Sequence, residues 1–255
     1  NCLAAALLQV WRDPLPRVLD SFEFGISSGQ HRSKTYQVEV VDAPQLTELT
    51  LSITPPTYTR LPVRRLDGAL GTIEVVEHSQ LLVETRFNKL MAAAELHWLT
   101  TSPDDGPGEQ SFTLAEDARS ATLQWTATSG GQFKLEMRDH DGFEAVADQS
   151  RALVIVADGP PALQVEETSD QPLKVSPYDT LPVPVAATDD FGVETLELHY
   201  ESDERSGVLR APGDVLSASS VEHEFRIAPA MLGLADGATL TYRIRVADGR
   251  PVPGP

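Results

Sequence analysis

The chain has 255 residues and a formal net charge of −18, from 38 acidic and 20 basic side chains. Because this field repels phosphate backbones and anionic lipid, it argues against nucleic-acid binding and against docking on a membrane surface. Apolar residues make up 41% of the chain, which is enough for packed cores and argues against a disordered protein.

The first element in chain order is an apolar segment at residues 3–8, which follows the chain's one cysteine, Cys2. A lone cysteine excludes an internal disulfide. The segment is far shorter than the ~20 residues that span a bilayer, and it lacks the basic region of a signal peptide. We expect a short helix or strand packed on the first domain; the alternative is the tail of a membrane anchor.

From residue 22 onwards, apolar and polar residues alternate with a period of two. The clearest runs are 22–26, 36–40, 133–137 and 240–246. Such runs predict strands with one buried and one wetted face. The 19 prolines and 17 glycines cluster between the runs, where the chain must reverse.

The runs also recur in a fixed order. Residues 78–83, 95–98 and 133–137 match 178–183, 197–200 and 242–246, at offsets of 100, 102 and 109. Residues 22–26 match 133–137 at an offset of 111, which indicates a third, partial copy. Constant order with slowly drifting spacing is typical of duplicated domains.

Proline marks the boundaries, because it cannot continue a central strand. The sequences around Pro44 and Pro160 divide the chain into the end of a preceding β-sandwich (1–42), a middle domain (44–157) and a third domain (160–255) that we expect to lack its last strand. The second strands are predicted at 79–85 and 180–187, the third at 93–100 and 193–201, the penultimate at 131–138 and 239–247, and the middle domain's last at 152–156.

The predicted fold class is therefore all-β, with tandem immunoglobulin-like or fibronectin-like β-sandwich domains of about 100 residues each. The linkers Ala43-Pro44 and Gly159-Pro160-Pro161 are short, which predicts a semi-rigid array.

Three stretches resemble a group of bacterial envelope proteins of unknown function. Residues 51–62 resemble a "PPxYTxLP" opening, residues 187–198 a "DD(F/Y)G" segment, and residues 22–41 a strand pair with a turn from Gly29 to Ser33. Those proteins carry serial immunoglobulin-like domains after membrane helices. The resemblance implies an extracytoplasmic, non-enzymatic array, anchored through segments outside this chain, with protein partners or other copies of itself.

Motifs for catalysis are absent from the sequence. It has no Gly-x-Ser-x-Gly elbow, no phosphate-binding loop and no His/Cys pair with zinc-ligand spacing. His97 and His199 occupy equivalent strand positions that should face outward, and Trp98 and Trp125 should pack in a core. We therefore expect no enzyme and no cofactor other than calcium. The alternative function is an accessory or carbohydrate-binding module of a larger enzyme.

Acidic turns supply the one candidate site. In an immunoglobulin-like sandwich, the loops after the second and penultimate strands lie at the pole where the linker enters. In the third domain this should gather Asp158, Asp189, Asp190 and Asp248, whose oxygens suit calcium. The alternative is that these aspartates only shape turns.

The preceding pole offers Asp42, Asp139 and Asp141, but Arg86 and Lys89 are predicted in the neighbouring loop. Cations from the chain should form ion pairs there and oppose a metal.

Overall fold

The computed structural model describes residues 18–68, 71–99, 110–147, 150–165, 172–235 and 237–250. The apolar segment at residues 3–8 lies outside them. The chain divides into two compact units, Asn1–Ala43 and Pro44–Pro255. In the part of the chain that is described, no helix is both long and apolar enough to cross a bilayer.

The first unit contains two small antiparallel pairs. Strand β1 (Phe22–Phe24) pairs with β4 (Tyr36–Val38), and β2 (Ser27–Ser28) pairs with β3 (His31–Arg32). The rings of Phe24 and Tyr36 stack across the first pair, 5.2 Å apart. Gly29 takes a φ of 59° at the tip, where a left-handed turn favours glycine. The strand pair expected from residues 22–41 is present.

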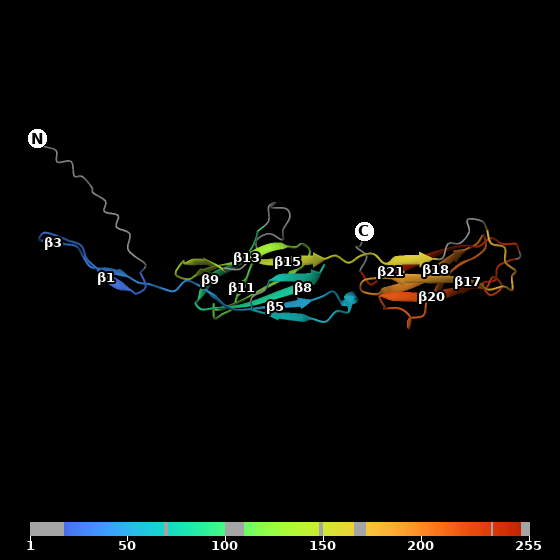
Figure 1. Cartoon of the computed structure of the whole chain (residues 1–255), viewed down its shortest axis with the longest axis horizontal. Helices are drawn as coiled ribbons and strands as arrows, with labels where there is room; N and C mark the ends of the chain where they lie inside the picture. The colour runs from blue at the N-terminus through green and yellow to red at the C-terminus, as the bar shows by residue number, and fades with distance from the viewer. Residues whose placement is uncertain are drawn as a thin grey trace, which may run out of the picture. The chain divides into compact units, whose positions relative to one another are not determined.

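The second unit begins with two facing sheets, the middle sandwich (Figure 1). One sheet has the order β11 (Thr113–Leu114), β12 (Ser120–Thr126), β8 (Gln80–Phe87), β5 (Leu46–Thr54), β6 (Arg64–Asp67). The other has the order β10 (Gln110–Ser111), β9 (Met91–Trp98), β13 (Gly131–Asp139), β15 (Arg151–Val156), β7 (Thr72–Val76), with β14 (Glu144–Val146) also on β13. All pairs are antiparallel except β15 with β7.

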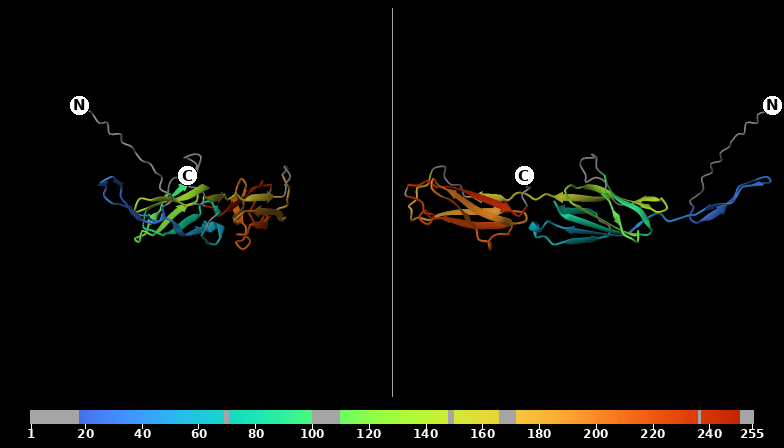
Figure 2. Two further views of the ribbon diagram at one scale, coloured as in Figure 1. Left: turned by 60° about the vertical axis from the view of Figure 1, so that its left-hand side comes forward. Right: turned by 180° about the vertical axis from the view of Figure 1, so that it is seen from behind.

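Within the described residues, the C-terminal sandwich has three strands in each sheet. The right-hand view of Figure 2 shows this sandwich from behind. One sheet has the order β16 (Ala162–Val165), β17 (Leu181–Thr188), β20 (Ser220–Ile227). The other has the order β19 (Ser206–Arg210), β18 (Val193–Glu201), β21 (Thr241–Asp248). The last described strand is β21.

Each sandwich encloses its own cluster of buried apolar side chains. Leu81, Met91 and nearby residues form the first cluster, and Leu198 with its neighbours forms the second. Along β8, and along β9 from Ala94 onwards, buried positions alternate with more exposed ones, which turns every second side chain inward. The chain is thus an all-β protein of tandem immunoglobulin-like sandwiches, as the sequence predicts.

The repeated strands occupy equivalent places. Strands β8, β9 and β13 correspond to β17, β18 and β21, and each begins or ends within two residues of its predicted limits. Asp139 lies opposite Met91 at the end of β13, and Asp248 lies opposite Val193 at the end of β21. These two aspartates therefore hold the same position in their sandwiches.

One expectation is wrong. Arg86 does not lie in the loop after the second strand, because β8 continues to Phe87. The alternation of the strand places Arg86 on the outer face between two buried residues, where its Nε lies 3.8 Å from Glu48 Oε2.

Candidate functional site

Three of the four predicted aspartates meet at one pole of the C-terminal sandwich. Asp158 precedes β16, Asp189 follows β17 and Asp248 ends β21. One carboxylate oxygen from each lies within 4.8 Å of the others. The strand order of the fold brings these segments to one end of the sheets, as the sequence argument anticipated.

Asp189 shapes the turn between β17 and β18. Its Oδ1 accepts hydrogen bonds from the backbone N–H groups of Phe191 (2.9 Å) and Gly192 (2.7 Å). Gly192 has a φ of 110°, and a Cβ there would lie 2.8 Å from the carbonyl oxygen of Ser217. The turn-shaping role considered from the sequence is therefore present, but it occupies only one oxygen. Within the described residues, the buried Oδ2 of Asp189 has no hydrogen-bond partner.

Arg250 is the cation nearest to the other two aspartates. Its Nε lies 2.9 Å from Asp248 Oδ2 and 3.2 Å from Asp158 Oδ2, and its Nη1 donates to the backbone carbonyl of Asp158 at 2.9 Å. Despite this ion pair, neither side-chain oxygen of Asp158 accepts a hydrogen bond of good geometry from any described residue. Burial raises the pKa of the Asp158 carboxyl.

Tyr58 comes from the middle sandwich, in the 3₁₀ turn η1 (Thr57–Thr59). Its hydroxyl faces the Asp158 carboxylate but falls short of hydrogen-bond geometry. Burial and then the charge of Asp158 raise the pKa of Tyr58 to about 12. Sequence reasoning missed Tyr58 and Arg250 as members of the site. The signals were the tyrosine of the "PPxYT" stretch and a cation two residues after Asp248.

Asp190, the fourth predicted residue, is exposed. Its Oδ2 accepts a long hydrogen bond of 3.4 Å from the backbone N–H of Gly159, which ties the β17–β18 loop to the linker. Asp190 therefore borders the cluster of Asp158, Asp189 and Asp248, which we call the aspartate cluster.

The equivalent pole of the middle sandwich carries its own cation. The ammonium of Lys89 donates to the fully buried Asp139 and lies 3.4 Å from Asp141 Oδ2. Burial works against the ionised form of Asp139, but hydrogen bonds from Lys89 and from the N–H of Phe143 outweigh it and lower the pKa of this carboxyl. Lys89 forms the ion pairs expected from the sequence.

The stretches that carry the family resemblance meet beside the aspartate cluster. The ring of Tyr58 packs edge-on against Phe191, with centroids 6.3 Å apart. Arg60, at the end of η1, pairs with Glu194 at 2.7 Å and donates to the carbonyl of Ser217 at 3.2 Å. Residues of the "PPxYTxLP" stretch thus contact residues in and next to the "DDFG" stretch.

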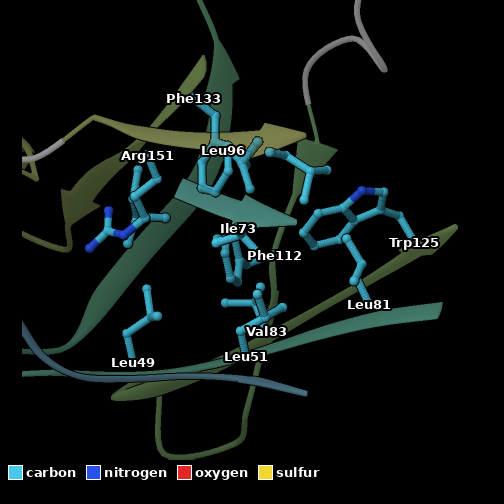
Figure 3. A pocket seen from close by; sticks show the side chains of 12 residues that line it. Leu49, Leu51, Ile73, Leu81, Val83, Leu96, Phe112, Trp125, Phe133 and Arg151 are labelled. Atoms are coloured by element: carbon cyan, nitrogen blue, oxygen red, sulfur yellow. The ribbon is translucent and has the colours of Figure 1, made fainter. Parts of the chain in front are cut away.

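Figure 3 shows a cavity inside the core of the middle sandwich, lined almost entirely by apolar side chains. Its volume of about 10 Å³ is room for a single water, against the 300–1,000 Å³ of ordinary ligand pockets. Trp125 lines this cavity, and Trp98 is buried beside Phe133. As predicted, these tryptophans pack in the core and form no exposed platform for a sugar.

Neither a family model nor a curated protein matches the chain. Among solved structures, the chain is similar to the titin domains Z1Z2 in complex with telethonin, with 16% identity, 83% of this chain and 100% of that chain covered, and a TM-score of 0.32. It is also similar to the fibronectin(III)-like modules of Clostridium thermocellum CbhA, with 12% identity, coverage of 69% and 82%, and a TM-score of 0.22. Likeness at this level says nothing about function, and the fold assignment depends on the sheets and cores described above.

Proposed function

We propose that the chain is a non-catalytic structural or protein-interaction module, a serial array of sandwiches in an extracytoplasmic envelope protein. The observation that carries this proposal is the contact between the stretch around Tyr58 and the stretch around Phe191. Both belong to the motifs that resemble the envelope group. In this chain their side chains connect one sandwich to the next, a role that suits an array.

The proposal is supported by the use of polar groups at these contacts. The guanidinium of Arg60 forms an ion pair with Glu194 and donates a hydrogen bond to the carbonyl of Ser217. The backbone of Arg60 is left-handed, with a φ of 57°. Left-handed backbone is costly for a residue with a side chain, so surrounding contacts must favour it. We call the contacts of Tyr58 with Phe191 and of Arg60 with Glu194 the junction. We infer that these contacts are specific, and that their loss loosens the array without unfolding either sandwich.

Protein partners, or other copies of the chain, have a surface available at the opposite pole of the C-terminal sandwich. Tyr178 is 91% exposed and Met231 is 89% exposed, and the segments that carry them are joined by a hydrogen bond from Ala230 N–H to the carbonyl of Pro177. Large apolar side chains exposed together are typical of protein contact sites.

The junction is tested by measuring the distance between spin labels on the two sandwiches. With Cys2 replaced by serine, labels go on the exposed residues Glu84 and Glu222. We expect a narrow distance distribution in this chain and a clearly broader one when Tyr58→Ala and Arg60→Ala are combined. Arg65→Ala, on the exposed strand β6, is the matched control. Equally broad distributions with and without the junction substitutions would contradict the proposal.

A further inference from the structure

The two sandwiches carry different charges at equivalent poles. After β8 the chain places Asn88 and then Lys89, whose ammonium binds the buried Asp139. After β17 it places Asp189 and then Asp190. The C-terminal sandwich thus has a carboxylate where the middle one has an amide, and a second carboxylate where the middle one has its ammonium.

The C-terminal sandwich nevertheless keeps an aspartate equivalent to Asp139, the residue that accepts from Lys89 in the middle sandwich. Asp248 occupies the place of Asp139 at the end of the penultimate strand. Asp158 adds a further carboxylate from the linker, so this pole gathers four aspartates, and among the described residues the cation paired with them is Arg250. The guanidinium of Arg60, which lies beside the turn, is paired with Glu194 instead. The pole retains an excess of negative charge that its own described cations do not balance.

The excess is centred on a buried atom. Asp189 is only 8% exposed, and its Oδ2 has no hydrogen-bond partner in the described part of the chain. Arg250 forms ion pairs with Asp248 and Asp158, and within the described residues it forms no ion pair with Asp189. Burying a carboxylate oxygen without a partner costs free energy of folding, because the charge loses its contact with water. A bound cation would offset that cost.

The geometry also suits a single ion. Oxygens that bind one calcium at about 2.3–2.6 Å lie at most about 5 Å apart. The nearest oxygens of Asp158, Asp189 and Asp248 fall within 4.8 Å of one another. The donor set holds oxygen alone, without the histidine or cysteine that zinc prefers. It is carried by two loops and a strand end, which suits the adaptable coordination of calcium better than the strict octahedron of magnesium.

We propose that Asp158, Asp189 and Asp248 bind a calcium ion at this pole, in the place that Lys89 fills in the middle sandwich. Asp190 and water complete the coordination. Binding displaces the guanidinium of Arg250 from the carboxylates, and its side chain is 39% exposed and so has solvent to move into. The ion connects the linker before β16 to the β17–β18 turn and to the end of β21. This inference goes beyond the proposed function and does not depend on it.

The experiment is a calcium titration of the whole chain at constant ionic strength. Binding is measured by isothermal titration calorimetry, and stability by thermal unfolding. Few protein ligands and a competing arginine predict a dissociation constant of about 10⁻⁴–10⁻³ M, as in extracellular modules. At calcium about tenfold above that constant, we expect the melting temperature of the C-terminal sandwich to rise by roughly 5–10 °C. Calorimetry should give one ion per chain.

Three variants isolate the site. Asp189→Asn keeps the Oδ1 that accepts from the N–H groups of Phe191 and Gly192 but removes the negative charge, and should abolish the rise. Asp214→Asn changes an exposed loop aspartate of the same sandwich and should leave the rise intact. Arg250→Gln removes the competing cation and should tighten calcium binding roughly tenfold, because its two ion pairs, with Asp158 and Asp248, no longer have to be broken.

A loop exchange tests the comparison between the poles. Asp189→Asn combined with Asp190→Lys gives this sandwich the Asn-Lys pair of the middle one, and should stabilise it without calcium while removing its response to calcium. No rise in melting temperature at about 10 mM calcium relative to matched sodium chloride would overturn the proposal. An equal rise in the native chain and in the Asp189→Asn variant would overturn it as well.

Discussion

Lys89 and Asp190 are each the second residue after the second strand of their sandwich, yet they carry opposite charges. The consequence depends on the aspartate that ends the penultimate strand of each sandwich. Asp139 is matched by the ammonium of Lys89, whereas Asp248 shares the guanidinium of Arg250 with Asp158. The two loop positions after the second strand, together with Asp158 from the linker, therefore separate a pole with a paired carboxylate from one that attracts a cation.

Replacing Lys89 with methionine should destabilise the middle sandwich at neutral pH, because it leaves the carboxylate of Asp139 buried without its cation. The measurement is thermal unfolding across pH 3–8. Lys134→Met, on the outer face of β13, is the control, and a substitution of that kind usually changes stability by less than about 0.5 kcal/mol. Equal stability of the Lys89→Met variant and the native chain would show that the ion pair contributes nothing.

The same pair predicts the sign of a pH effect. The pKa of Asp139 is lowered in the folded chain, so its contribution to stability is present above the ordinary aspartate pKa and is lost as the pH falls through the lowered value. In Lys89→Met, burial dominates and should raise the pKa of Asp139. That variant should therefore lose less stability on acidification than the native chain does, and a parallel loss in both would contradict this account.

At the scale of the element, the β17–β18 turn positions both the junction and the aspartate cluster. Asp189 closes it through two backbone N–H groups, and Gly192 supplies the φ of 110° that the reversal requires. On the other side of the turn, Phe191 packs on Tyr58. One four-residue turn thus serves the fold, the contact between sandwiches and the proposed site.

Gly192→Ala should destabilise the C-terminal sandwich by about 2 kcal/mol or more, because left-handed backbone disfavours alanine and the new Cβ would lie 2.8 Å from the carbonyl of Ser217. The measurement is urea unfolding followed at the C-terminal transition. Gly213→Ala is the matched control, since its added Cβ meets nothing within 4 Å. Equal stabilities of the two variants would show that the turn is not constrained at Gly192.

The strands that recur in both sandwiches could be predicted from the sequence, because two independent patterns indicate them: the period-two alternation and the constant order of the repeats. Strand β7 was not assigned, since its pairing with β15 is parallel and links residues far apart in the sequence. Asp158, Asp189 and Asp248 could be grouped because strand order alone brings chain ends to one pole. Tyr58 could not, because it comes from the other sandwich, and Arg250 could not, because its place depends on how a side chain beyond the end of β21 turns back toward Asp248 and Asp158.

At the scale of the whole molecule, the duplicated sandwich explains both the common features and the differences. Residues 44–255 form one compact unit by their contacts, yet their buried apolar side chains fall into two separate clusters. Leu81 in one cluster and Leu198 in the other are both fully buried. A chain with two cores should unfold in two steps, with the junction adding modest coupling between them.

Differential scanning calorimetry of the whole chain, with Leu81→Ala and Leu198→Ala, tests the duplicated fold most directly. Each substitution should cost about 2–5 kcal/mol in its own core. We expect two transitions, of which Leu81→Ala lowers only the one that belongs to the middle sandwich and Leu198→Ala only the other. A single cooperative transition that both substitutions lower together would contradict it.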